Sequence, residues 1–164
     1  MAHHSHSQLR FKPHFLELGD APVPTTSLTQ FLRGEKPETA HHNAAWSSQT
    51  GKGLLYISKN EESKKSPGSI LNLADITNVS KEGDKVFSFR LGRHKHTFEA
   101  KTQDERNGWL AAIESTHESA AKSKDEILGS QGYKDTMNSL NSGMFCYWRH
   151  AITASAISMT DRLF

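Results

Sequence analysis

The stretch TFEAKTQDERNGWLAAI, residues 97–113, changes its periodicity half-way and decides the fold. Its first residues continue a strand pattern, and its later residues follow the 3.6-residue repeat of an amphipathic helix. Thr102 and Glu105 have the spacing of a capping box, in which a hydroxyl begins a helix and a carboxylate three residues later reaches back. We therefore predict that a helix begins directly after a strand at Thr102.

The predicted helix has one apolar face. Residues on this face recur at i, i+3, i+4 and i+7, namely Trp109, Ala112, Ile113 and Thr116. Arg106 falls on the opposite face, which we expect to meet solvent. A buried Trp removes about 150–250 Å² from water, so we interpret Trp109 as a core residue that closes the strands before it. The helical pattern ends near Ala120 or Lys122.

The segments before this helix have the two-residue period of strands. Residues 86–91 alternate, and a Gly-Arg turn at 92–93 separates them from residues 94–100 at hairpin spacing. Further strands are predicted at residues 53–58 and within 69–83, whereas residues 25–38 suit either a helical turn or a strand. Strands followed by one amphipathic helix predict an α+β, mainly β, fold in which the C-terminal helix packs on an antiparallel sheet or caps the open end of a small barrel. Its predicted structural residues are Trp109, Ile113, Phe87, Phe89 and Phe98.

Composition narrows the class of protein. The chain has 164 residues, a net charge of +2 and one cysteine, Cys146, which has no internal partner for a disulfide. This near balance argues against nucleic-acid binding, which needs a dense positive field, and the cysteine usage fits a reducing cytosol. No apolar run approaches the roughly 20 residues that span a bilayer, and the first residues lack the apolar core of a signal peptide. We expect a cytoplasmic location, with peripheral membrane contact as a variant.

The domain organisation follows from changes in composition along the chain. Three prolines predict an extended N-terminal arm over residues 1–24. A domain at 25–122 and a short helical extension at 123–140 follow. Residues 141–164 have a different, apolar composition, and we expect a disordered tail outside the domain. The alternative is an amphipathic helix that touches a membrane through Met144, Phe145, Tyr147 and Trp148.

Several runs together resemble a known family. SILNLADITNV, KVFSFRLG and HKHTFEAKTQDERNGWLAAIE resemble the second half of a pleckstrin homology (PH) domain. SLTQFLRGEKPETAHHNAAWSSQTGKGLLYISK and GSQGYKD resemble, more specifically, the fungal PH family named for the meiotic expression up-regulated protein. The resemblance covers roughly residues 15–140. It implies a seven-stranded, strongly bent antiparallel barrel that the helix with Trp109 closes.

The resemblance also implies where a ligand would bind. In many PH domains, the loop between the first two strands carries Lys and a later Lys/Arg-x-Arg that bind phosphoinositide phosphates. Here the corresponding segment, FLRGEKPETAHHNAAW, offers Arg33 and Lys36 as fixed cations, and no Lys/Arg-x-Arg follows. We predict a non-enzymatic binding or adaptor domain for a protein or, weakly, an anionic lipid; the alternative is a phosphoinositide-specific recruitment domain. The phosphate candidates are Arg33, Lys36, Lys52, Lys59, Lys64 and Lys65.

The sequence contains no recognisable catalytic or metal-binding constellation. His94 and His96 share a strand face at a spacing that suits zinc, but two ligands do not make a site. The nucleophile motif G-x-S-x-G and the metalloprotease motif H-E-x-x-H are missing, and TGKG at residues 50–53 lacks the spacing of a phosphate-binding loop. We expect no catalytic residue, metal or cofactor. The partner, a protein or an anionic membrane, and the oligomeric state stay open.

Overall fold

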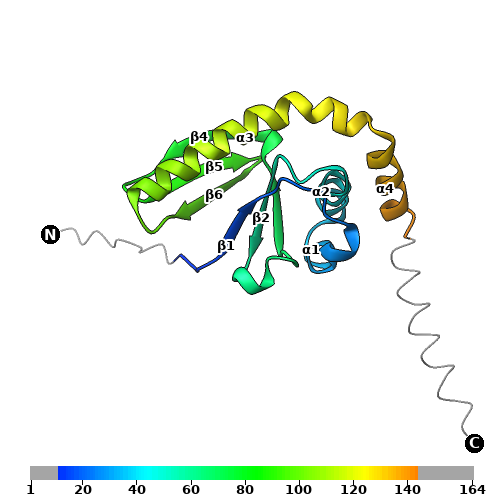
Figure 1. The fold of residues 1–164 in the computed structure, drawn as a ribbon, viewed down its shortest axis with the longest axis horizontal. Coiled ribbons are helices and arrows are strands. Elements are labelled where there is room, and N and C mark those ends of the chain that lie inside the picture. Colours follow the sequence, from blue (N-terminus) through cyan, green and yellow to red (C-terminus); the bar gives the residue numbers. More distant parts are fainter. Residues whose placement is uncertain (1–10, 144–164) are drawn as a thin grey trace, which may run out of the picture.

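The computed structural model describes residues 11–143, which form two antiparallel sheets and a set of helices (Figure 1). Sheet A contains β1 (Phe15–Leu18), β2 (Leu54–Ser58) and β3 (Ser69–Asn72). Sheet B contains β4 (Ile76–Lys81), β5 (Val86–Leu91) and β6 (His94–Glu99). The α-helices are α1 (Thr29–Gly34), α2 (Pro37–Gln49), α3 (Gln103–Gly129) and α4 (Gln131–Asn141). Short 3₁₀ turns are η1 (Thr25–Leu28), η2 (Glu61–Ser63) and η3 (Leu73–Asp75).

Sheet A is the middle layer of the molecule. Successive side chains of a strand point to opposite faces, and β2 has buried apolar residues on both. Leu54 and Tyr56 pack with residues of α1, α2 and α4, while Leu55 packs with sheet B and α3. A strand buried on both faces reads as a continuous apolar run, which explains the sequence LLYI at residues 54–57.

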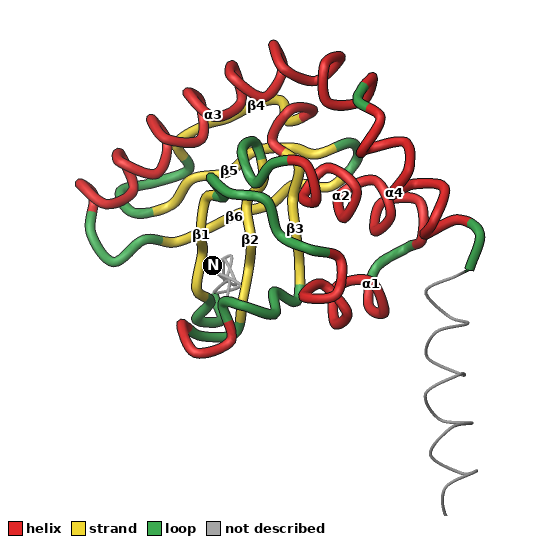
Figure 2. The backbone as a smooth tube through the Cα atoms, turned by 45° about the vertical axis from the view of Figure 1, so that its right-hand side comes forward, coloured by secondary structure: helices red, strands yellow, loops and turns green. Residues whose placement is uncertain are grey.

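The helices α1, α2 and α4 cover the face of sheet A that points away from sheet B (Figure 2). Pro37 occupies the first position of α2, where its missing N–H costs nothing. Alanines on the buried side let the helix approach the sheet closely, and Trp46 is fully buried there. The Trp46 indole Nε1 donates a hydrogen bond to the Lys52 carbonyl at 2.9 Å. Helix α2 was not predicted from the sequence, and α1 resolves the helix-or-strand alternative over residues 25–38 in favour of helix.

Helix α3 covers sheet B and begins where it was predicted. The Thr102 side chain accepts a hydrogen bond from the Glu105 N–H at 3.1 Å, and the Glu105 carboxylate accepts one from the Lys101 N–H at 3.0 Å. The expectation that Arg106 faces solvent is wrong. Its side chain is 3% exposed, because the guanidinium donates to the carbonyls of Gly83 and Val86 in the β4–β5 hairpin.

The architecture departs from the expected barrel in two ways. Residues 11–143 contain six strands, and the two sheets do not close into a seven-stranded barrel, because helices occupy the connection between β1 and β2. Strand β1 lies inside the segment predicted as an extended arm, since residues 15–18 pair with β2. Order therefore begins before residue 25.

The C-terminal helices are longer than the sequence pattern indicated. Helix α3 continues without interruption past residue 122 to Gly129, and α4 then turns back beside α2 (Figures 1 and 2). The predicted tail at 141–164 falls, from residue 144 onward, outside the described residues. Within the described part of the chain, no helix is both long and apolar enough to cross a membrane.

Candidate functional site

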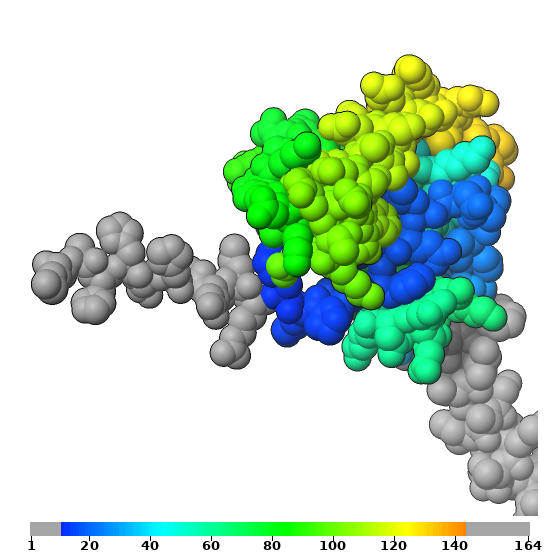
Figure 3. Space-filling view, turned by 60° about the vertical axis from the view of Figure 1, so that its left-hand side comes forward, coloured from blue at the N-terminus to red at the C-terminus, as the bar shows by residue number. Residues whose placement is uncertain are grey.

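Two adjoining hollows lie on one face of the molecule, between the segment that follows β1 and the loop that joins β2 to β3. Figure 3 shows this N-terminal segment in blue next to the blue-green loop. The first, which we call the Arg33 hollow, has a volume of about 520 Å³ and is lined by Thr26, Ser27, Thr29, Gln30, Arg33 and Ser66. The second, the Tyr56 hollow, measures about 330 Å³, and its lining includes Glu17, Asp20, Val23, Tyr56, Lys64 and Lys65. Ser27 lines both, so the two hollows adjoin each other.

The Arg33 hollow is rich in hydrogen-bond donors. Leu28 and Phe31 are fully buried and anchor η1 and α1, so Arg33 in the last turn of α1 projects outward. Hydroxyls and a side-chain amide complete the lining. Of the residues that the structure describes, none that lines this hollow carries a carboxylate. Guanidinium and hydroxyl groups without a competing carboxylate suit a phosphate or another oxyanion.

The Tyr56 hollow has an apolar floor and a charged rim. The Tyr56 hydroxyl lies 2.7 Å from the Ser47 hydroxyl, and burial raises the pKa of Tyr56, so the phenol stays neutral. Gly19 rests directly against this ring: a Cβ there would meet the Gly51 carbonyl oxygen at 2.4 Å and Tyr56 Cε2 at 2.6 Å. Only glycine permits this approach, which brings the segment after β1 onto sheet A.

The structure brings together three of the six phosphate candidates. Arg33 lines one hollow, and Lys64 and Lys65 line the other. The remaining three line neither: Lys36 is the N-cap of α2, Lys52 lies in the turn before β2, and Lys59 follows β2. The acidic residues of the same rim were not predicted from the sequence, because nothing local links them to lysines more than forty positions away.

The predicted structural residues gather under α3. Phe87, Phe89 and Ile113 are buried in one cluster, and half-buried Phe98 stacks on Phe87 with ring centroids 5.3 Å apart. Trp109 is half-buried at the edge of this cluster. The large fully buried tryptophan is instead Trp46, on the far side of sheet A.

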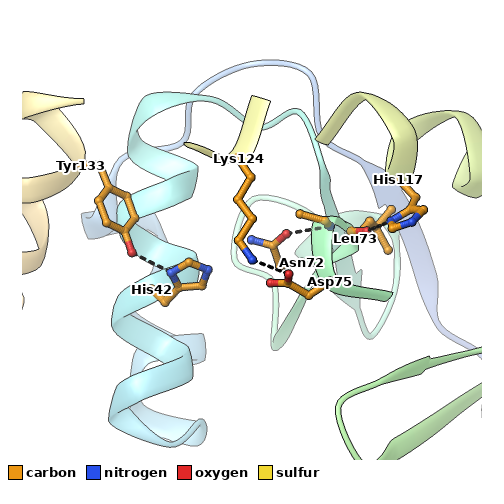
Figure 4. Close-up of polar contacts among 8 residues, drawn as sticks. His42, Asn72, Leu73, Asp75, His117, Lys124 and Tyr133 are labelled. Carbon is orange, nitrogen blue, oxygen red and sulfur yellow. Dashed lines mark hydrogen bonds and ion pairs between the residues drawn. The ribbon is translucent and has the colours of Figure 1, made fainter. Parts of the chain in front are cut away.

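A polar cluster joins α2, η3, α3 and α4 (Figure 4). His42 Nδ1 lies 2.6 Å from the Tyr133 hydroxyl, and Lys124 Nζ lies 2.5 Å from the Asp75 carboxylate. Burial lowers the pKa of His42, and the charge of Asp75 opposes this shift. Asn72 nearby caps η3 through a hydrogen bond from the Ala74 N–H at 3.0 Å.

The contacts of this cluster bind helices to one another. No group of three metal-binding side chains occurs among residues 11–143, and the cluster contains no serine or cysteine nucleophile. Its residues are far apart in the sequence, so no motif could have revealed it. We assign it a structural role in holding α4 against α2.

A family model for the pleckstrin homology domain matches residues 8–116, more than half of the chain. The chain belongs to the pleckstrin homology domain family. The match includes both sheets, α1, α2 and the first half of α3, and it ends before α4. No curated protein and no solved structure matches the chain. PH domains are generally non-catalytic binding modules, so membership confirms the general prediction of a binding or adaptor domain.

Proposed function

We propose that this PH domain is a non-enzymatic module that associates weakly with anionic membrane surfaces through the face that carries the two hollows. One observation carries the proposal: Arg33 from α1 lines one of two adjoining hollows, and Lys64 and Lys65 from the β2–β3 loop line the other. The three cations come from two separate elements of the chain. Phosphate groups of lipids are the ligands that such a set recognises.

The expected affinity is modest. Each well-placed cation contributes about 1 kcal/mol near an anionic surface, so the three together contribute about 3 kcal/mol. Glu17 and Asp20 on the rim of the Tyr56 hollow repel the same surface. The Arg33 hollow, which no carboxylate lines, is therefore the favoured contact for a lipid phosphate.

The alternative of phosphoinositide-specific recruitment has less support. The segment that would carry the second basic motif folds into α1 and α2, and much of α2 is buried against sheet A. It presents Arg33 and Lys36 but no Lys/Arg-x-Arg. Affinity that follows the total vesicle charge is therefore expected, without preference for a particular inositol phosphate pattern.

Co-sedimentation with vesicles tests the proposal. We expect the full chain to bind phosphatidylserine vesicles at low salt and to bind phosphoinositide vesicles of equal charge similarly. It should not bind neutral vesicles of phosphatidylcholine alone. The triple variant R33Q/K64Q/K65Q should lose about 100-fold in affinity, and each single variant about fivefold. Lys81→Gln, at the exposed end of β4, is the matched control and should change little.

Each other outcome has a definite meaning. Absence of binding at low salt, or undiminished binding by the triple variant, contradicts the proposal. Binding confined to phosphoinositide vesicles supports the specific-recruitment alternative, and a lipid-independent protein partner supports the adaptor alternative. The proposal includes two finer points. The chain is related to the fungal PH family, which the runs quoted above support. It has a cytoplasmic, peripheral location at a membrane, which Arg33, Lys64 and Lys65 on the face with the hollows support.

A further inference from the structure

The rim of the Tyr56 hollow carries opposite charges on two facing elements. Glu17 and Asp20 belong to β1 and the segment after it, and Lys64 and Lys65 belong to the β2–β3 loop. Between residues 11 and 143 the ion pairs are Lys95–Glu82 and Lys124–Asp75. The four rim charges take part in neither pair, although all four line the same hollow.

Both elements of the rim are held by backbone hydrogen bonds. On the acidic side, the Gly19 N–H donates to the Leu54 carbonyl at 3.0 Å and the Val23 N–H donates to the Ser47 carbonyl at 2.8 Å. On the basic side, the Ser66 N–H donates to the Ser63 carbonyl at 2.9 Å and the Gly68 N–H donates to the Ile57 carbonyl at 3.1 Å. The backbones that carry the charges are therefore positioned without a ligand, which limits the ordering that binding would require.

The floor between the two charged sides is neutral and largely apolar. The ring of Tyr56 with Val23 and Pro67 forms part of it, and the Tyr56 hydroxyl already has Ser47 as a partner. At about 330 Å³ the hollow is at the small end of the range for ligand pockets, roughly 300–1,000 Å³. A small ligand with an apolar middle and opposite charges at its ends matches this lining.

We infer that the Tyr56 hollow binds a zwitterion that joins a primary ammonium to a phosphate, with ethanolamine phosphate as the simplest example. The ammonium donates hydrogen bonds to the carboxylates of Glu17 and Asp20, and the phosphate accepts them from Lys64 and Lys65. The short carbon linker lies over Tyr56. A quaternary ammonium has no N–H to donate, so choline phosphate should bind less well.

This inference does not rest on the membrane proposal. A purely anionic surface needs only the cations, and the acidic rim residues oppose it. A zwitterion needs both signs. The free compound and a phosphatidylethanolamine headgroup share this chemistry, so the test has one arm for each source.

Isothermal titration of the full chain provides the first arm. We expect saturable binding of ethanolamine phosphate, at least 10-fold tighter than inorganic phosphate, ethanolamine or choline phosphate, because each charged hydrogen bond lost weakens binding about 10-fold or more. Glu17→Gln and Asp20→Asn should remove this advantage and leave the affinity for inorganic phosphate no lower. Lys64→Gln and Lys65→Gln should weaken both ligands. Glu62→Gln, on η2 outside the lining, is the matched control and should behave as the wild type.

The second arm compares neutral vesicles with and without phosphatidylethanolamine. If the wild type binds only the vesicles with phosphatidylethanolamine, and Glu17→Gln does not bind them, the lipid headgroup is the source of the ligand. If the wild type binds ethanolamine phosphate but neither kind of vesicle, the ligand is a soluble compound. Equal affinity for ethanolamine phosphate and inorganic phosphate, or no saturable binding of either zwitterion source, overturns the inference. Folding of every variant is verified by its amide NMR spectrum, so a misfolded variant does not count as loss of binding.

Discussion

The two faces of sheet A differ in how far along the chain their contacts reach. Sheet B and α3 cover one face. There β4 pairs with β5 and β5 pairs with β6, and α3 comes next in the sequence, so the elements in contact are close together along the chain. The helices α1, α2 and α4 cover the other face, and there His42 meets Tyr133 and His41 meets Asn141 across 91 and 100 residues. The first side contains the most recognisable PH sequence, while the hollows open beside the second. The residues that most resemble a PH domain and the two hollows thus lie on opposite sides of sheet A, although the family match also covers α1 and α2.

The two tryptophans give the sharpest test of this comparison. Trp46 is fully buried between sheet A and the helices, and its indole N–H is hydrogen-bonded. Trp109, a residue of α3, is only half-buried at the edge of the cluster on the other face of sheet A. We predict that Trp46→Ala lowers the free energy of unfolding by about 3–5 kcal/mol and Trp109→Ala by only about 1–2 kcal/mol. Urea denaturation of both variants measures the difference. If the free energy of unfolding fell equally in both variants, or fell more in Trp109→Ala, Trp46 would not be the main core tryptophan.

A second prediction concerns α4, which lies beyond the residues that the family model matches. Leu140 is 7% exposed and packs in the core between sheet A and the helices. Leu140→Ala should therefore lower the free energy of unfolding by about 2–4 kcal/mol, as for other buried leucines. Asn138→Ala, on the exposed side of the same helix, should change it little. If the two variants were equally stable, α4 would be an appendage rather than part of the domain.

The contact between α2 and α4 should also depend on pH. Burial lowers the pKa of His42, with Asp75 opposing and Lys124 adding to the shift. Because the unfolded chain binds the proton more readily, the contribution of this histidine is complete above about pH 6.5 and is lost as the pH falls below that value. Imidazole NMR titration should give a pKa for His42 below 6.5.

Two variants separate this effect from other titrations. Tyr133→Phe removes the hydroxyl next to His42 and should cost about 1 kcal/mol at neutral pH. His42→Gln should flatten the acid slope of stability in the range where His42 titrates. An unchanged slope in His42→Gln would assign the pH dependence to another group.

The smallest effect is expected on sheet B. Hydrogen bonds from Lys95, Ser88 and Ser80 lower the pKa of Glu82 from 4.5 to about 2. Its contribution to stability is therefore present above about pH 4.5 and declines as the pH falls toward 2. Carboxyl ¹³C titration should show this low pKa in the wild type and a rise toward 4.5 in Lys95→Gln. Global stability should hardly change, because the carboxylate and its partners lie at the surface.

The same contrast explains which features were predictable from sequence. Strands β2, β5 and β6 and the start of α3 at Thr102 follow local periodicity and capping, and the structure confirms them. Helix α2 was missed, although Pro37 at its first position was a usable signal. The expectation for Arg106 was wrong because a local pattern does not show that its guanidinium donates hydrogen bonds to carbonyls of the β4–β5 hairpin.

The candidate site was predictable only in part. Arg33, Lys64 and Lys65 were predicted from their charge, and they line the two adjoining hollows. The facing acids Glu17 and Asp20 were not, because a tertiary pairing of β1 with β2 brings them there. The lining of the Tyr56 hollow therefore depends on contacts that no local pattern encodes.

Amide NMR of the full chain on phosphatidylserine vesicles that contain a paramagnetic lipid tests the central claim most directly. We predict that the strongest line broadening occurs at residues 26–34 and 64–68, the segments that line the two adjoining hollows, and that α4 and sheet B are spared. Strongest broadening on sheet B or α4, or equal broadening over the whole domain, would contradict the assignment of this face as the binding surface.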